Sequence, residues 1–202
     1  MFDGVMRKLM DPVLTKAGTW AARRGFHANQ VTLWGLALGV MAAALIGVGA
    51  PTVWALAPLL GNRIADGIDG ALARAKGKTD FGGFLDIVAD FAFYGLIPFA
   101  FALRDSANAL PASFLLLSFY VNGASFLGFA VLAEKRGLQT SARGDKSLYF
   151  SVGIMEGAET IAALSAMCLW PLLFAPIAWV FGTLCGATAV ARVVLARQVF
   201  GR

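Results

Sequence analysis

The sequence predicts an all-α integral membrane protein with six transmembrane helices behind an N-terminal amphipathic helix. Of its 202 residues, 58% are hydrophobic and 14% are charged, whereas soluble domains carry about 25% charged residues. The mean hydropathy is +0.71, and the apolar residues fall in runs of roughly the 20 residues that cross a bilayer as a helix. No stretch has the composition of a linker or a repeat, so we expect one domain over residues 1–202.

The N-terminal segment, residues 2–24, is expected to form a helix that lies in the membrane interface. Its cations would lie near anionic lipid head groups while its apolar face enters the bilayer. The apolar residues that recur at helical spacing are Phe2, Val5, Met6, Leu9, Val13, Leu14 and Ala17.

Six apolar segments follow, in a predicted core over residues 29–197. Backbone groups in lipid must be satisfied internally, which favours helices for all six. The second segment continues through an aspartate-rich stretch, and the third carries Asp86 and Asp90. The predicted spans are residues 31–49, 51–76, 81–103, 111–133, 147–170 and 171–190.

Positive charge is distributed unevenly among the connections between these spans. Lys and Arg lie before the first span, after the second, after the fourth and after the sixth, while the opposite connections hold only Arg104. Because cytoplasmic loops are enriched in Lys and Arg, we expect both termini and the aspartate-rich stretch on the cytoplasmic side. Topology and lipid contact therefore account for the net charge of +5 better than nucleic-acid binding does.

Four aspartates interrupt the apolar sequence between residues 66 and 90. Positions spaced i, i+3, i+4, i+7 share one face of a helix, and the short turn at residues 76–80 makes the second and third spans antiparallel neighbours. The two aspartate faces are therefore expected to meet. Their members are Asp66, Asp69, Gly70, Ala73 and Arg74 on one helix, and Gly82, Asp86 and Asp90 on the next.

Carboxylates at membrane depth are costly, and they persist where they pair, bind ions or move protons. Ion pairs with Arg63 and Arg74 alone would leave negative charge uncompensated. Hard carboxylate oxygens without neighbouring Cys or His suit Mg²⁺ or Mn²⁺, and four carboxylates have the capacity for two ions. Two metals can bridge a diphosphate and stabilise both the attacking and the leaving oxygen.

The aspartates belong to the pattern D-x2-D-G-x2-A-R-x7-G-x3-D-x3-D, with every fixed position matched. This pattern resembles the signature of the CDP-alcohol phosphatidyltransferases, and the stretches at residues 146–150 and 156–160 are similar to a bacterial inner-membrane branch of that family. The resemblance implies a membrane enzyme of phospholipid biosynthesis, with six spans after an interfacial helix, in the bacterial inner membrane. It also implies a homodimer.

The family resemblance also implies residue roles. Asp66, Asp69 and Asp86 would ligate the metals, and Asp90 would complete the second metal site. Asp90 would act as general base on the acceptor hydroxyl, which attacks the β-phosphorus of CDP-diacylglycerol and releases CMP. The residues expected to bind the CDP-lipid are Asn29, Thr32, Gly70, Ala73, Arg74, Thr79 and Gly82. Capping of the first span is an alternative role for Asn29 and Thr32.

The alcohol acceptor stays open at this point. Glycerol 3-phosphate, phosphatidylglycerol, inositol phosphate, serine and a free polyol would all need the same metal core. The residues expected to form an acceptor subsite are Arg63, Lys146, Glu156 and Glu159. Setting the topology is the alternative role of the loop cation Lys146.

A divalent-cation transporter is the alternative to a transferase, because intramembrane carboxylates also line ion pathways. Transporters commonly show repeated halves with broken helices. Here the two halves show no repeat, and the aspartates gather at the cytoplasmic ends of two spans. These features favour the enzyme.

Overall fold

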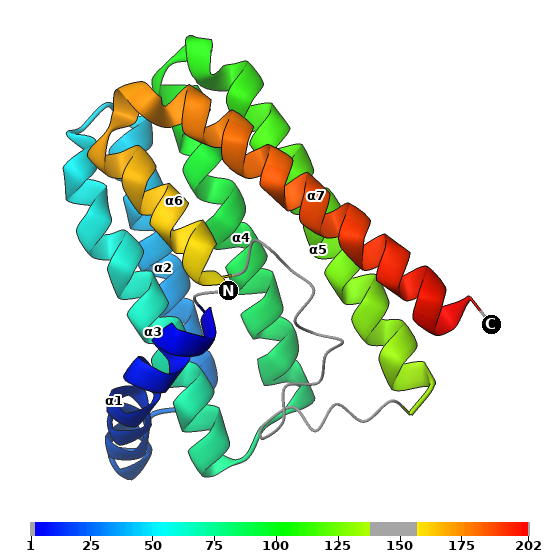
Figure 1. The fold of residues 1–202 in the computed structure, drawn as a ribbon. Helices are drawn as coiled ribbons and strands as arrows, with labels where there is room; N and C mark the ends of the chain where they lie inside the picture. The colour runs from blue at the N-terminus through cyan, green and yellow to red at the C-terminus, as the bar shows by residue number, and fades with distance from the viewer. Residues whose placement is uncertain (1–2, 138–156, 202) are drawn as a thin grey trace.

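The computed structural model describes residues 3–137 and 157–201, and all regular elements in these ranges are helical, as the sequence predicts. Figure 1 shows the longer helices packed into a bundle. In chain order the elements are α1 (Asp3–Arg23), α2 (Ala28–Gly47), η1 (Thr52–Ala55), α3 (Leu56–Lys76), α4 (Asp80–Arg104), η2 (Ser106–Asn108), α5 (Ala109–Lys135), α6 (Gly157–Leu169), η3 (Pro171–Leu173) and α7 (Phe174–Phe200).

The bundle has one end rich in Lys and Arg, which we call the basic end. α2 and α4 begin there, α3, α5 and α7 finish there, and α1 lies beside the start of α2 (Figure 1). The three short helices η1, η2 and η3 lie at the opposite end. The cations that define the basic end are Lys76, Lys78, Lys135, Arg136 and Arg197. This distribution matches the charge pattern used to predict the topology.

Within residues 3–137 and 157–201, four helical segments are long and apolar enough to span a membrane: α2, α4, α5 with η2, and α7 with η3. Their outward faces carry large exposed apolar side chains, such as Val40, Leu117 and Val190, which lipid would cover. The predicted count of six spans is not confirmed. α3 is 21 residues long but carries the charged motif, and the described part of α6 has 13 residues.

The observed helices differ from the predicted spans mainly at their ends. α2 begins three residues before the first predicted span, at Ala28, and the second segment divides into η1 and α3. α7 continues to Phe200, ten residues beyond the predicted end at 190. Arg192 explains part of this extension, because its guanidinium donates to the Asn122 side chain and the Ser125 hydroxyl of α5 at 2.9 and 2.7 Å. Arg192, which ends the apolar run in the sequence, thus forms a contact between α7 and α5 and does not end the helix.

The core lies around α4 in the half of the bundle away from the basic end. Phe93, Ile97 and Phe101 of this helix are fully buried. The Phe101 ring stacks on Phe174 of α7 with 4.4 Å between centroids. Packing in this apolar half fixes the position of α4 relative to its neighbours. It therefore also fixes where Asp86 and Asp90, nearer the start of α4, lie along the bundle axis.

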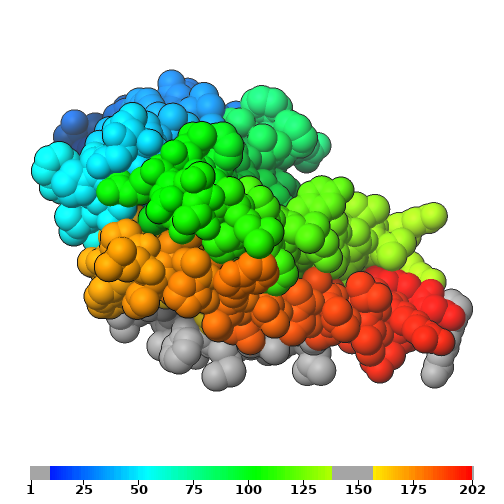
Figure 2. Space-filling model, turned by 90° about the horizontal axis from the view of Figure 1, so that it is seen from above, coloured from blue at the N-terminus to red at the C-terminus, as the bar shows by residue number. Residues whose placement is uncertain are grey.

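Helices α5 and α7 form a second, closely packed pair, and Figure 2 shows them side by side in the view from above. Gly182 permits this approach, because a Cβ at this position would lie 2.7 Å from the Phe114 ring. Small residues at helix interfaces are typical of membrane bundles. The pair borders the part of the bundle formed by α2, α3 and α4, which contains the aspartates.

Helix α1 spans nearly the range predicted for the interfacial helix, and it packs on α3. A Cβ at Gly18 would lie 2.6 Å from Cβ of Ala71 and 2.9 Å from backbone atoms of α3. Backbone cannot move aside as a flexible side chain can. The absence of a side chain at Gly18 therefore allows α1 to lie directly against the helix that carries Asp66 and Asp69.

We expect Gly18→Ala to lower the free energy of unfolding by about 1–3 kcal/mol, because overpacking forces shifts in well-packed neighbours. Gly128→Ala is the matched control, since an added Cβ there has no neighbour within 4 Å. In a helix interior that control should be neutral or stabilising by up to about 1 kcal/mol. Thermal unfolding in detergent micelles measures both, and equal melting temperatures for the two variants would contradict the packing argument.

Candidate active site

The first three aspartates of the motif converge between α3 and α4. One carboxylate oxygen from each of Asp66, Asp69 and Asp86 lies within 4.8 Å of the other two. Asp69 is buried, with 4% of its surface exposed, and the other two are half-buried. The predicted meeting of the two helix faces is therefore observed for these three residues.

All four aspartates line one small cavity of about 10 Å³, together with polar and small residues from α2, α3 and α4. A space of this size holds about one water-sized sphere. The complete lining given by the described residues is Thr32, Gly35, Asn62, Arg63, Asp66, Asp69, Asp86, Ala89 and Asp90.

Thr32 of α2 supports the buried aspartate directly. Its hydroxyl donates a hydrogen bond of 2.6 Å to Oδ2 of Asp69. The start of α2 is capped by other residues, since the Gln30 side chain accepts a bond from the His27 backbone N–H. The capping alternative for Thr32 is therefore wrong, and α2 supplies the site with a hydroxyl that orients one carboxylate.

Asp90 lines the same cavity but is not one of the three carboxylates that converge within 4.8 Å, and it is bonded to Arg63. One terminal nitrogen of Arg63 donates to Oδ1 of Asp90 at 2.8 Å, and the other lies 3.7 Å from Oδ2 of Asp66. The guanidinium also lies over the rings of Phe93 and Tyr94, at 4.5 and 5.3 Å from their centroids. Arg63 is thus a cation inside the carboxylate cluster.

Asn62 holds this arginine in place and was missed in the sequence analysis. Its Oδ1 accepts a 2.6 Å bond from Nε of Arg63, and its Nδ2 donates a 2.8 Å bond to the Gly35 carbonyl of α2. The residue is 3% exposed, so both bonds matter energetically. The sequence signal that would have identified Asn62 is a polar residue at the end of an apolar run, directly before Arg63.

Several residues predicted to contact the CDP-lipid lie together at the basic end of the site. Thr79 caps α4 by accepting a bond from the Gly82 backbone N–H at 3.1 Å. A Cβ on Gly82 would lie 3.1 Å from Oδ1 of Asn29, so α2 and α4 approach closely there. On α3, the exposed Arg74 reaches back toward Gly70, one turn earlier, and Ala73 is half-buried. Their roles in substrate binding remain predictions.

The predicted acceptor subsite is only partly visible. Lys146 and Glu156 lie outside the described residues. Glu159 is half-buried in the first turn of α6 and is not part of the described lining of the aspartate cavity. Arg63 lines the cavity, where it donates to Asn62, Tyr94 and Asp90.

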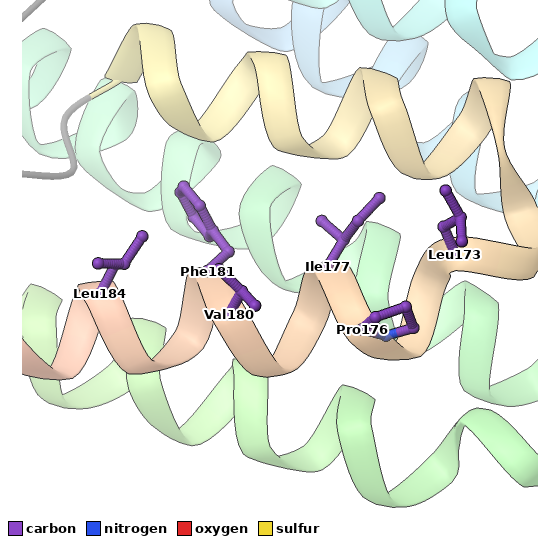
Figure 3. Close-up of a pocket in the computed structure, with 6 residues that line it drawn as sticks. All are labelled: Leu173, Pro176, Ile177, Val180, Phe181 and Leu184. Carbon is purple, nitrogen blue, oxygen red and sulfur yellow. The ribbon is translucent and has the colours of Figure 1, made fainter.

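A larger cavity of about 340 Å³ lies along α7, and its lining is entirely apolar. Figure 3 shows Ile177 and Phe181 pointing from α7 toward α6. The side chains that the described residues contribute to this lining are those of Leu173, Pro176, Ile177, Val180, Phe181 and Leu184. Carboxylate, amide and guanidinium groups are found instead around the aspartate cavity.

The donor set at the aspartate cavity fits a small hard divalent cation. Carboxylate oxygens from α3 and α4 converge on a space for one small sphere, and a hydroxyl orients one of them. Such oxygen ligands suit Mg²⁺ or Mn²⁺. Among the described residues of the cavity lining, Arg63 is the one cation and balances one of the four negative charges, so a bound cation has an electrostatic reason to be there.

Residues 26–196 match the family model described as CDP-alcohol phosphatidyltransferase. The chain belongs to this family. Inner membrane protein YnjF of Escherichia coli is 42% identical over 197 residues, covering 96% of this chain and 94% of the relative. The family assignment, made from the aspartate pattern, is confirmed, and the chain is a CDP-alcohol phosphatidyltransferase enzyme.

A solved structure agrees with this assignment at the level of the fold. Phosphatidylinositol phosphate synthase PgsA1 of Mycobacterium tuberculosis, crystallised with CDP-DAG bound, superposes with a TM-score of 0.72. The match covers 92% of this chain and 94% of that chain at 22% identity. At that identity the comparison supports the fold of this CDP-alcohol phosphatidyltransferase, an all-α membrane protein.

We expect Asn62→Leu to destabilise the protein by about 1–3 kcal/mol, because it leaves the Gly35 carbonyl and Nε of Arg63 without their partner. Asn108→Leu is the matched control, since its side chain makes a longer bond of 3.4 Å, to the Phe101 carbonyl. Thermal unfolding in detergent gives the comparison. A loss for Asn62→Leu no greater than for the control would show that the Asn62 bridge is not stabilising.

Proposed function

We propose that this enzyme transfers a phosphatidyl group from CDP-diacylglycerol to the hydroxyl of an alcohol acceptor and releases CMP, with dependence on Mg²⁺ or Mn²⁺. The observation that carries the proposal is the convergence of Asp66, Asp69 and Asp86 at one small cavity, within the residues that match the family model. The relative crystallised with CDP-DAG bound supports the choice of donor.

Asp90 is proposed as the general base. Arg63 bonds Oδ1 of this carboxylate, so we assign the acceptor proton to Oδ2. A carboxylate that is bonded on one oxygen keeps a fixed orientation while the other oxygen takes the proton. The acceptor oxygen then forms its bond to the β-phosphorus as the bond from that phosphorus to the CMP oxygen breaks.

The remaining residues are assigned to binding. When a divalent ion is bound, it supplies electrostatic stabilisation of the diphosphate and acidifies the attacking alcohol. Asp66, Asp69 and Asp86 would hold the ion, and Arg74 would balance charge on the departing CMP. Asn29, Thr79 and Gly82 would contact the nucleotide near the start of α4, where backbone N–H groups favour a phosphate.

We place the protein in a bacterial inner membrane with the basic end facing the cytoplasm. The similarity to YnjF, an inner membrane protein, supports the compartment, and the cations at the basic end support the orientation. The aspartate cavity would then face the compartment that supplies nucleotide-activated lipids. A homodimer remains a prediction from the family.

The direct test uses the protein in lipid nanodiscs with radiolabelled CDP-diacylglycerol and each acceptor class in turn. We expect CMP release to require Mg²⁺ or Mn²⁺ and to fall by about 10²–10⁴-fold in Asp90→Asn, the range for loss of a general base. Asp80→Asn is the matched control, an exposed carboxylate on the same helix that is absent from the cavity lining. Lipid chromatography identifies the product.

Two outcomes would overturn the proposal. CMP release that persists in a chelator would remove the metal dependence. Divalent-cation flux through proteoliposomes, without turnover of any CDP-lipid, would favour the alternative of a transporter.

A second prediction concerns Thr32, whose hydroxyl orients Asp69. We expect Thr32→Val to lower the affinity for Mn²⁺ by about 10–100-fold, the usual effect of losing a partner of a metal ligand. Thr183→Val is the control, because that hydroxyl bonds the Trp179 carbonyl of its own helix and lies outside the described cavity lining. Titration of Mn²⁺ followed by electron paramagnetic resonance gives both affinities, and an equal affinity in the two variants would exclude this role for Thr32.

A further inference from the structure

The position of Arg63 bears on how many ions the carboxylate cluster accepts. The motif carries four carboxylates, and the sequence predicts two divalent ions. In the structure only Asp66, Asp69 and Asp86 converge closely enough to share an ion, while Asp90 is bonded to the arginine. We propose that, in the substrate-free enzyme, Arg63 occupies the place of a second divalent ion and that the cluster binds one ion.

The enclosure of Arg63 supports this proposal. Its three nitrogens are engaged by Asn62, by Asp90, and by Tyr94 together with Asp66, and its flat face lies on the Phe93 ring. The side chain is 15% exposed. Because every nitrogen has a partner, Arg63 is held as a fixed cation between Asp66 and Asp90, and it contacts one oxygen of each of the two carboxylates that a second ion would bind.

Charge and space lead to the same conclusion. Four carboxylates and one guanidinium leave three negative charges, and one divalent ion reduces this to one. A second divalent ion would make the cluster positive and would lie within a few ångströms of the guanidinium, where like charges repel strongly in a partly buried site. The cavity of about 10 Å³ has room for one small ion.

The proposal rests on the metal-dependent function proposed above, and ion counting separates the two. The protein, in nanodiscs of zwitterionic lipid and without substrate, is titrated with Mn²⁺, and free Mn²⁺ is measured by electron paramagnetic resonance against empty nanodiscs. We expect one Mn²⁺ per chain for the unaltered protein. Two ions would overturn the assignment to Arg63 and leave the metal-dependent function standing, whereas none would overturn both.

Substitutions at Arg63 test whether this arginine is what limits the cluster to one ion. Arg63→Met removes the charge at similar length and should raise the count to two ions, while Arg63→Lys keeps a cation and should bind one. Arg104→Met is the matched control, because this half-buried arginine bonds the Ile46 and Ala50 carbonyls at the opposite end of the bundle. A count of one in Arg63→Met, with the protein folded, would contradict the proposal.

Asp90→Asn gives an independent measurement if Arg63→Met fails to fold. Under the proposal Asp90 is not a ligand in the substrate-free enzyme. The Asp90→Asn variant should therefore bind one ion with an affinity within about threefold of that of the unaltered protein, a small change beside the roughly 10–100-fold loss that is usual when a metal ligand loses its partner. Asp69→Asn should weaken binding far more. Equal losses in Asp69→Asn and Asp90→Asn would show that Asp90 is a ligand and would overturn the proposal.

Discussion

The burial of four carboxylates between two helices of an apolar bundle is the constraint on which the rest of this structure depends. Unpaired charges in such surroundings are strongly destabilising. Each aspartate here has a neighbouring group or space that can offset the cost of burying its charge. Asp69 accepts a hydroxyl from α2, Asp90 is bonded to Arg63, and Asp66, Asp69 and Asp86 share a space suited to a cation. Groups from α2, α3 and α4 therefore each contribute part of the compensation.

Helix α2 has a larger part in this arrangement than its sequence suggests. It reads as an ordinary apolar span, yet its Thr32 hydroxyl and Gly35 carbonyl both bond residues of α3. These two contacts fix the rotation of α3 about its own axis, and this rotation decides whether Asp66 and Asp69 face α4 or the lipid. The apolar core around Phe93 and Phe101 fixes α4 in the same way from the other half of the bundle.

Helical spacing is a local property, and it was sufficient to predict which aspartates share a face and that the two faces meet. The position of each carboxylate within the cluster depends on the relative rotation and height of α3 and α4, and spacing carries no information on either. Asp90 accordingly lines the same cavity as the other three aspartates but is bonded to Arg63 and lies outside the group of three that converges within 4.8 Å. The end of α7 was missed for a related reason, because Arg192 bonds α5 instead of marking the membrane boundary.

The two arginines that flank the aspartates on α3 show how surroundings divide similar side chains into different roles. Arg63 and Arg74 are eleven residues apart, close to three helical turns, so they lie on the same face of the helix at either end of the motif. Arg63 is enclosed by Asn62, Asp90 and two aromatic rings, and its charge is committed to the carboxylates. Arg74 is exposed near the basic end, where its guanidinium can reorient toward a diphosphate. Under the proposed function the two arginines would therefore act differently: Arg63 would stabilise the carboxylate cluster without a ligand, and Arg74 would balance charge that develops on the leaving CMP.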